Sequence, residues 1–582
     1  MAVLLASHLR FDVARPREPS NDRLIFSKGH AAPLLYAVWK AAGAMTDEEM
    51  MTLRKRGSRV EGHPTPALPY VDVATGSLGQ GLPVAIGMAL ADARSGGKGA
   101  RYWVLMGDSE MAEGSVYEAF EAGGFYGLSG VVGIVDMNRL GQRGPTMVQW
   151  DGEVYAERAR AFGWSARVID GHDPAAIDDA YAAAAKSRVP TLVVARTKKG
   201  AGVSFLEDKE GWHGRALTGE QAASALGEID GGQRARPVTV TPAVPTPVPS
   251  PAETAQRRPV RLPAYDVGTS VATRSAFGDA LVAIGDANAR VVVLDGEVAN
   301  STYTERFGRA HPDRFFEMYI AEQLMVGAAV GMQALGWTPF AGTFAAFLTR
   351  AFDQIRMASV SMATMHLVGS HAGVSIGEDG PSQMGLEDIA MMRAVHGSTV
   401  LYPSCANATA KLALEMSNRR GIHYLRTTRE KTPVLYAPSE VFHPGGAKVP
   451  RRSDHDSVAI VAAGITVHEA LRAHELLRAD GVYARVIDAY SVKPIDRATL
   501  LEAARECPRG LVVVEDHHPE GGLADAVLEA FEGQPAPRVA RLAVRLMPGS
   551  ASPDEQLDDA GIDARAVAEV ARGMCEKGVA LA

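Results

Sequence analysis

The chain has few of the features that mark disulfide-bonded, membrane-spanning or nucleic-acid-binding proteins. Only three cysteines occur in 582 residues, and none has CxxC spacing, so neither a disulfide framework nor a zinc cluster is expected and a reducing cytoplasm fits. No apolar run is long enough to cross a bilayer, and the apolar start at Met1 is too short for a signal peptide. A net charge of −8 argues against a dedicated nucleic-acid binder. Small molecules are therefore the expected partners.

The length requires several domains, because a single core stops growing at roughly 250–300 residues. Eight prolines fall within residues 231–263, which predicts a linker. Elsewhere, short apolar runs alternate with Ala-rich helical stretches, which is typical of parallel strands joined by crossover helices. The expected strands are Tyr102–Met106, Val131–Val135, Thr191–Ala195, Arg290–Leu294, Met365–Val368, Ser398–Leu401, Val458–Ala462, Ala484–Asp488 and Gly510–Glu515, and two of the expected helices are Glu322–Leu335 and Ala406–Met416. We predict an α/β fold with three consecutive domains, at residues 1–230, 264–440 and 441–582.

The first two expected strands end in polar residues that suit a metal. Gly107 and Asp108 follow the strand Tyr102–Met106, and Asn138 follows Val131–Val135. Parallel strands present their carboxyl ends at one sheet edge, where anionic ligands bind. A carboxylate, an amide oxygen and the backbone carbonyl of Leu140 form a hard oxygen set for Mg²⁺ or Ca²⁺, with diphosphate oxygens completing the shell. Alternatively, Asp108 only caps a helix and Asn138 only makes an Asx turn.

The wider sequence resembles the transketolases, which are enzymes that use thiamine diphosphate. The matching motifs, in the family's order, are Ser27-Lys28-Gly29-His30, Gly62-His63-Pro64, Thr75-Gly76-Ser77-Leu78-Gly79-Gln80-Gly81, Gly107-Asp108-Ser109, Asp136-Met137-Asn138-Arg139-Leu140 and Trp212-His213-Gly214. The sequences of these motifs are most similar to those of the animal-type branch, and the resemblance covers nearly the whole chain outside the linker. It implies a diphosphate-binding domain, a pyrimidine-binding domain and a smaller C-terminal domain.

The resemblance also implies the reaction and the assembly. Transketolases are transferases of the pentose phosphate pathway. They move a two-carbon ketol unit reversibly from a ketose phosphate, such as xylulose 5-phosphate, to an aldose phosphate, such as ribose 5-phosphate or erythrose 4-phosphate, through a carbanion of thiamine diphosphate. The family forms cytoplasmic homodimers, in which the pyrimidine domain of one subunit meets the diphosphate domain of the other.

Several residues match family positions that hold or activate the cofactor. Glu322, at the head of a small-residue helix, matches the glutamate beside the pyrimidine, although alone it could be an acid favoured by the helix dipole. Phe344 and Phe347 are three apart on one face of an expected helix start; Phe347 is the stacking candidate, and Phe344 suits the core. Glu113 resembles a residue that reaches Glu322 across the dimer. The cofactor set implied is Gly107, Asp108, Ser109, Asn138, Glu113, Ser77, Leu78, Phe347, Glu322, His63 and His213.

A second set matches positions that contact the substrate. Histidines suit proton transfer near hydroxyl groups, and arginines suit phosphate. The family's catalytic histidines correspond to His30, His63 and His213, beside Glu322. The substrate set implied is His30, His213, Arg274, Ser301, His371, Asp379, Gln383 and Arg429. Singly, such histidines are more often structural, and such arginines are usually surface groups.

Three departures from the family pattern affect the prediction. Ser109 replaces a glycine that lets the backbone approach the diphosphate, and Glu297 stands where aspartate is usual. A leading Ser-Gly-His-Pro segment is absent, and we expect the true start codon to lie upstream. Two alternative functions stay open: a specialised transketolase-like or deoxyxylulose phosphate synthase-like enzyme, and an inactive paralogue acting as a binding subunit.

Overall fold

The computed structural model describes residues 1–94, 99–230, 239–248 and 258–576. These residues form two compact units, each with its own packed interior. The first comprises Met1–Thr254, Gln323–Trp337 and Val360–Met362, and the second comprises Ala255–Glu322, Thr338–Ser359 and Ala363–Ala582. Most residues of the predicted domains at 264–440 and 441–582 belong to the second unit, while Gln323–Trp337 and Val360–Met362 belong to the first. None of the described helices meets the length and hydropathy needed to cross a membrane.

The first unit is built on a five-stranded parallel sheet in the order β1-β2-β3-β5-β4. Its strands are β1 (Arg23–Phe26), β2 (Tyr102–Gly107), β3 (Val131–Met137), β4 (Ser165–Asp170) and β5 (Thr191–Arg196). Its helices are η1 (Leu4–His8), η2 (Gly29–Ala31), α1 (Ala32–Ala41), α2 (Asp47–Met50), α3 (Gly81–Arg94), η3 (Ser109–Ala112), α4 (Gly114–Phe125), α5 (Gly152–Ala161), α6 (Pro174–Lys186) and α7 (Gly219–Asp230), where η denotes short tight or wide helices.

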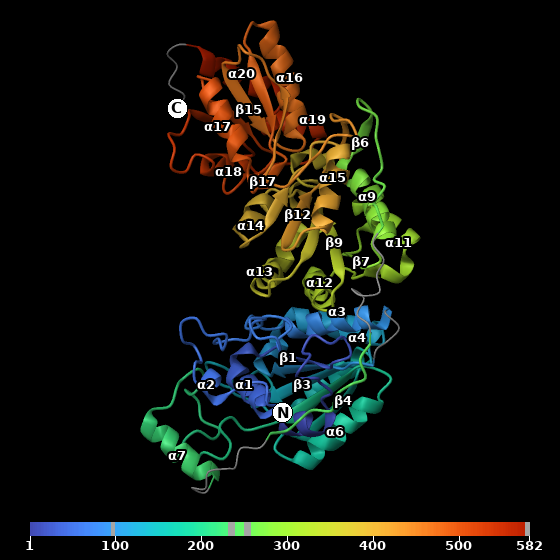
Figure 1. The fold of residues 1–582 in the computed structure, drawn as a ribbon, viewed down its shortest axis with the longest axis vertical. Coiled ribbons are helices and arrows are strands. Elements are labelled where there is room, and N and C mark those ends of the chain that lie inside the picture. Colours follow the sequence, from blue (N-terminus) through green and yellow to red (C-terminus); the bar gives the residue numbers. More distant parts are fainter. Residues whose placement is uncertain (95–98, 231–238, 249–257, 577–582) are drawn as a thin grey trace. The chain divides into compact units, whose positions relative to one another are not determined.

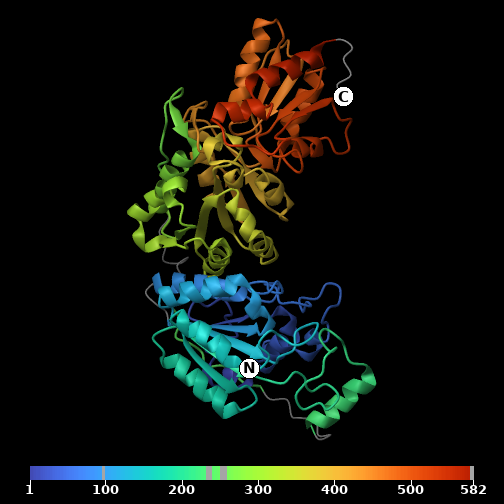
Figure 2. The ribbon, with the colours of Figure 1, turned by 180° about the vertical axis from the view of Figure 1, so that it is seen from behind.

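Helices cover both faces of this sheet (Figures 1 and 2), with α3 and α4 on one side and α6 on the other. Alternate residues of β1 and β2, such as Phe26, Trp103 and Leu105, point to the side where Trp39 of α1 and Tyr181 of α6 close the core. Because both faces of the central strands β2, β3 and β5 are buried, these strands are mostly apolar runs, whereas the edge strand β4 is partly exposed.

The second unit contains two larger sheets and a small two-stranded antiparallel sheet. The first large sheet has the order β17-β11-β12-β10-β9-β7-β8 and is parallel except for β17. Its strands are β7 (Val291–Asp295), β8 (Phe315–Glu317), β9 (Thr338–Phe344), β10 (Met365–Ser370), β11 (Thr399–Leu401), β12 (Ile422–Arg426) and β17 (Ser491–Lys493). The strands β6 (Ser270–Ala272) and β13 (Lys431–Pro433) form the small antiparallel sheet. The accompanying helices are α9 (Thr273–Ala287), α10 (Ala299–Thr302), α11 (Glu305–Ala310), η4 (Pro312–Arg314), η5 (Phe347–Ala351), α13 (Phe352–Val360), η6 (Val374–Asp379), η7 (Pro381–Gln383), α14 (Asp388–Ala394) and α15 (Ala406–Ser417). Helix α12 (Glu322–Ala334) begins in this unit at Glu322, and its remaining residues belong to the first unit.

The other large sheet of this unit has the order β14-β16-β15-β18-β19, and β14 alone is antiparallel to its neighbour. Its strands are β14 (Lys448–Arg451), β15 (Val458–Ala462), β16 (Ala484–Asp488), β18 (Leu511–Val514) and β19 (Val539–Leu542), and its helices are α16 (Thr466–Ala479), α17 (Arg497–Glu506), α18 (Leu523–Glu529), α19 (Pro553–Asp559) and α20 (Ala564–Cys575). The two sheets are joined through Arg426, which is fully buried and donates to Asp388 and Asp516, both at 2.8 Å.

The predicted α/β class is confirmed, and the predicted strands and helices end within about two residues of the observed ones. Of the predicted linker at 231–263, residues 231–238 and 249–257 lie outside the described part of the chain. Between them, the N–H of Val240 donates to the carbonyl of Ala41, and the N–H of Phe11 donates to that of Ala243, each at 2.8 Å. This stretch therefore runs along the first unit.

Candidate active site

Asp108 ties together the carboxyl ends of two neighbouring strands. It follows β2, where Gly107 is the register partner of Asp136 on β3. Its buried carboxylate accepts from the N–H of Ser109 at 2.9 Å and from the N–H of Arg139, just beyond β3, at 2.7 Å. The expectation that Asp108 and the residues after β3 share one sheet edge is confirmed. Asp108 also caps η3.

The oxygen atoms at this edge have the chemistry of a magnesium or calcium site. Burial raises the pKa of Asp108, a penalty that a bound cation would offset. Asn138 is buried, and its side-chain oxygen accepts from the N–H of Leu140 at 3.1 Å, so the Asx turn is also present. One carboxylate, one amide oxygen and a backbone carbonyl fit a hard cation that keeps other oxygen ligands. Among the described residues, no three His, Cys, Asp or Glu side chains gather in a metal-binding group.

Two lysines bring positive charge to the same edge, beside Asp108 and Asp136. The ammonium of Lys28 is buried and lies 2.5 Å from the carboxylate of Asp136. Burial alone would raise the pKa of Asp136, but Lys28 lowers it below its ordinary value. Burial, with the charge of Lys28, lowers the pKa of Lys199, which also feels Asp108 and Asp136. Lysine ammonium groups beside a hard-oxygen set fit a metal-bound diphosphate. Sequence reasoning assigned no role to either lysine.

Two of the predicted histidines lie side by side in the first unit, with their rings tilted by 43°. The rings of His30 and His213 are 4.9 Å apart, and Lys199 Nζ lies 3.2 Å from His213 Nδ1. Partial burial and the charges of Lys28 and neighbouring groups lower the pKa of His30 to about 4, and the pKa of His213 is also lowered, mainly by burial. Both rings are therefore mostly neutral at pH 7 and can donate or accept a hydrogen bond.

His63 lies beside the predicted loop at residues 76–79. A Cβ atom built on Gly76 would lie 3.1 Å from the His63 ring. A Cβ atom built on Gly79 would lie 2.6 Å from the side chain of Glu113. Both glycines have positive φ, +139° and +83°. The two glycines therefore let the segment that contains Ser77 and Leu78 pack closely against His63 and Glu113. Glu113 is exposed.

In the second unit, Glu322 is a buried carboxylate at the first position of α12. It is 1% exposed and accepts from Arg350 at 2.8 Å. The rings of Phe344 and Phe347 stack at 5.1 Å, and Phe344 also stacks on His371 at 3.8 Å. Phe344 is buried while Phe347 keeps an accessible ring. The expected helix start is wrong for Phe344, which ends β9; only Phe347 begins a helix, η5.

The predicted phosphate-binding residues of this unit converge. Arg274 donates to the backbone carbonyl of Ser301 at 2.9 Å, and Arg429 pairs with Asp379 at 3.0 Å. Burial, followed by the charges of Arg274 and Arg429, lowers the pKa of His371 to about 3. The five side chains thus share one region, with His371 neutral. Nearby in the chain, Gln383 ends η7, and its N–H donates to the carbonyl of Gly380 at 3.2 Å.

One buried acid near these residues escaped prediction. Asp295, at the end of β7, accepts from the hydroxyls of Thr302 and Thr304 at 2.7 and 2.6 Å, and burial raises its pKa to about 7. Glu297, two residues on, has a φ of +64° and is exposed. The run Asp295-Gly296-Glu297 directly after an apolar run could have indicated a functional acid at Asp295, but sequence reasoning assigned significance to Glu297 alone.

Three family models match the chain in order. They are the transketolase thiamine diphosphate binding domain at residues 1–244, the transketolase pyrimidine binding domain at residues 269–434 and the transketolase C-terminal domain at residues 447–567.

The chain belongs to the transketolase family. It is 46% identical to human transketolase over 579 residues, which is 99% of this chain and 92% of the human protein. It is also 46% identical to mouse transketolase-like protein 2 over 569 residues, 97% of this chain and 90% of that protein. The crystal structure of transketolase from Campylobacter jejuni shares its fold, with a TM-score of 0.85 at 21% identity over 98% of this chain and 94% of that chain.

These transketolase relatives span both units, so the resemblance seen in the motifs holds for the whole chain, and the alternative functions are not favoured.

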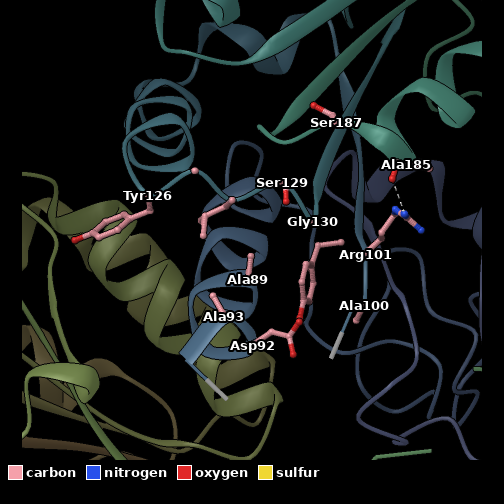
Figure 3. Close-up of a pocket in the computed structure, with 14 residues that line it drawn as sticks. Ala89, Asp92, Ala93, Ala100, Arg101, Tyr126, Ser129, Gly130, Ala185 and Ser187 are labelled. Carbon is pink, nitrogen blue, oxygen red and sulfur yellow. Dashed lines mark hydrogen bonds between the residues drawn. The ribbon is translucent and has the colours of Figure 1, made fainter. Parts of the chain in front are cut away.

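A separate hollow of about 330 Å³ lies at the opposite, amino end of β2 (Figure 3). Asp92 and Arg101 line it, and Arg101 donates to the carbonyl of Ala185 at 3.0 Å. It is distinct from the edge that carries Asp108.

Proposed function

We propose that the protein is a transketolase that transfers a two-carbon ketol unit reversibly from a ketose phosphate to an aldose phosphate. Xylulose 5-phosphate is the proposed donor, and ribose 5-phosphate or erythrose 4-phosphate the acceptor, as in the pentose phosphate pathway. The single observation that carries the proposal is the Asp108 carboxylate joining the ends of β2 and β3 in a domain of the thiamine diphosphate-binding class. A related transketolase from Pichia stipitis, 22% identical, has been solved with sedoheptulose 7-phosphate, a ketose phosphate.

We propose that the cofactors are thiamine diphosphate and Mg²⁺ or Ca²⁺. Asp108, Asn138 and the carbonyl of Leu140 would hold the metal, and Lys28 and Lys199 supply cationic charge at the same edge. The remaining residues proposed to contact the cofactor in this unit are Gly107, Ser109, Ser77, Leu78, Glu113, His63 and His213. When bound, thiamine diphosphate supplies a carbon nucleophile that attacks the ketose carbonyl.

The proposed catalytic groups move or hold protons. Glu322 would hold a proton at the cofactor's pyrimidine, and its hydrogen bond from Arg350 helps to orient the carboxyl group. Phe347 offers an aromatic face for the pyrimidine ring. His30, His63 and His213 would pass protons between substrate hydroxyls, a role for which the neutral state of His30 is suited.

The proposed sugar phosphate site lies in the second unit. Arg274 and Arg429 would bind the phosphate, beside Ser301. His371, Asp379 and Gln383 would contact the sugar hydroxyls. Arg429 is already aimed by the carbonyl of Ile376 at 2.9 Å, so the phosphate would meet a preset guanidinium.

We propose that the protein works as a cytoplasmic homodimer with each active site at the subunit interface. The domain boundaries that we propose are 1–230, 264–440 and 441–582, with the linker at 231–263. Support comes from the order of the three family models.

A coupled assay with xylulose 5-phosphate and ribose 5-phosphate tests the proposal. With thiamine diphosphate and Mg²⁺ present, we expect turnover by the wild type and a loss of at least about a hundredfold in Glu322→Gln, the range expected for a positioned acid or base. Glu415→Gln is the matched control, because it also removes an ion pair, with Arg419 at 2.9 Å. Wild-type protein that neither turns over sugar phosphates nor binds thiamine diphosphate in calorimetry contradicts the proposal.

A further inference from the structure

Glu110 is a buried carboxylate that the proposed reaction leaves without a role. It lies in η3, two residues after Asp108, and only 1% of it is exposed. Burial raises its pKa, while hydrogen bonds from Ser27, Gly107 and Gly79 favour the charged form. A carboxylate in such a place is costly unless its oxygens are satisfied, so its partners deserve an explanation.

Its partners come from three separate segments. Oε1 accepts from the hydroxyl of Ser27 and from the N–H of Gly79 at 2.8 Å, and Oε2 accepts from the N–H of Gly107 at 3.0 Å. The Ser27 hydroxyl in turn accepts from the N–H of Gly81 at 3.0 Å. One side chain therefore joins the end of β1, the loop before α3 and the end of β2.

Each joined segment carries residues of the proposed diphosphate site. His30 follows Ser27 on the first segment, while the second contains Ser77 and Leu78. Asp108 follows Gly107 on the third. The carboxylate thus touches the backbone next to the site without belonging to the set of residues proposed to touch the cofactor.

The loop between residues 76 and 81 has no room to shift. A Cβ on Gly81 would lie 2.5 Å from the Cβ of Ser27, and one on Gly29 would lie 2.6 Å from the backbone nitrogen of Gly76. Ser115 donates to the carbonyl of Gly79 at 2.8 Å, so both polar groups of Gly79 are held by the segment that follows β2. The position of this loop is therefore set by Glu110 and its neighbours.

We propose that Glu110 is a positioning residue that locks the three loops around the diphosphate and the metal, and this rests on the proposed function. An amide cannot replace it, since both oxygens face backbone N–H donors and the NH₂ of glutamine would oppose one of them. Loss of this carboxylate should weaken cofactor binding before it affects substrate binding, because the joined loops lie at the proposed diphosphate site and not at the proposed sugar site.

The test compares Glu110→Gln with wild type and with Glu469→Gln, a buried carboxylate in α16 that accepts from the N–H of Ala564 at 3.0 Å. By calorimetry with thiamine diphosphate and Mg²⁺, we expect the Kd of Glu110→Gln to rise at least tenfold. At saturating cofactor, its kcat should fall by a smaller factor. Glu469→Gln should keep the wild-type Kd. Ser27→Ala, which removes one of the three donors, should give a smaller rise in Kd and little further rise when combined with Glu110→Gln.

Amide hydrogen exchange without cofactor supplies an independent readout. Peptides that contain Gly79 and Gly107 should exchange at least tenfold faster in Glu110→Gln than in wild type or in Glu469→Gln. If Glu110→Gln does not fold, Ser27→Ala carries both measurements. An unchanged Kd together with unchanged exchange overturns the inference alone. Wild-type protein without affinity for thiamine diphosphate overturns the proposed function as well, and a loss of kcat with an unchanged Kd would make Glu110 catalytic rather than positioning.

Discussion

Asp488, at the end of β16, is a single buried acid whose charge should set part of the pH dependence of stability. It has no exposed surface, and burial raises its pKa to about 7. Its Oδ2 accepts from Ser404 at 2.5 Å and from Tyr436 at 2.9 Å, whereas its Oδ1 has no hydrogen-bond partner among the described residues. An asparagine could keep both bonds through its single oxygen.

We predict that the Asp488→Asn variant gains stability relative to wild type as the pH rises. The folded acid binds its proton more tightly than the unfolded one, so the stability it contributes is complete below about pH 4 and is lost as the pH rises through about 7. This loss amounts to at most about 4 kcal/mol in wild type and is absent in the variant. Urea unfolding at pH 5 and pH 8 measures it, with Asp353→Asn, at an exposed carboxylate, as the control. Parallel pH profiles for wild type and Asp488→Asn would contradict the assignment.

Some residues of the candidate site could be predicted from the sequence, and others could not. Asp108 and Asn138 could be predicted, because each directly follows an apolar strand and parallel strands share an edge. The pair Lys28 and Asp136 could not, since 108 residues separate them and only the packing of β1 beside β2 and β3 brings them together. Glu110 lacked a signal for a similar reason: its donor Gly107 is local, but Ser27 and Gly79 lie 83 and 31 residues earlier in the chain.

At the scale of elements, the short helix η6 is held by α19, which belongs to the next sheet. Gly377, in η6, has a φ of +79°, and a Cβ there would lie 3.1 Å from Pro553 at the start of α19. The same short helix carries Asp379 and the Ile376 carbonyl that orient Arg429. A helix outside the proposed pocket thus supports one of its walls.

Gly377→Ala should therefore weaken both stability and substrate binding. The strained backbone costs roughly 1 kcal/mol or more, and the new methyl group pushes η6 away from Pro553. We expect the KM for the sugar phosphate donor to rise several-fold with a smaller change in kcat. Gly561→Ala is the matched control, because Gly561 has a φ of +66° and open space around it. A KM that rises equally in both variants would show that strain alone is responsible.

The sequence predicts elements well where one periodicity dominates. Buried parallel strands are apolar runs that end in polar residues, which is why β15 and β16 were predicted with their observed bounds. The segment from Gly342 to Phe347 was misread, because two aromatics three apart suit a helix, yet Gly342–Phe344 continues the buried strand β9. The stacking of Phe344 on His371 depends on β10 lying beside β9, which no local sequence pattern indicates.

At the scale of the whole molecule, the two units carry complementary halves of the proposed chemistry. The first holds the metal and diphosphate residues around Asp108, and the second holds Glu322 and Phe347. Composition and alternating elements predicted the α/β class and three consecutive α/β domains. They could not show that the second and third sheets form one unit, because that depends on buried contacts such as Arg426 with Asp516, which are 90 residues apart.

The proposed homodimer makes a prediction that no single-subunit enzyme shares. If each active site takes Asp108 from one subunit and Glu322 from the other, a heterodimer of Asp108→Ala with Glu322→Gln contains one intact site and one doubly defective site. Purified through two different tags, it should show about half of the wild-type activity, although each homodimer is inactive. The control heterodimer, Asp108→Ala with Asn138→Ala, has both changes in the same half and should stay inactive, because every site then lacks one metal ligand. If both groups of a site came from one subunit, the first heterodimer would be as inactive as the control, and sites at the subunit interface would be ruled out.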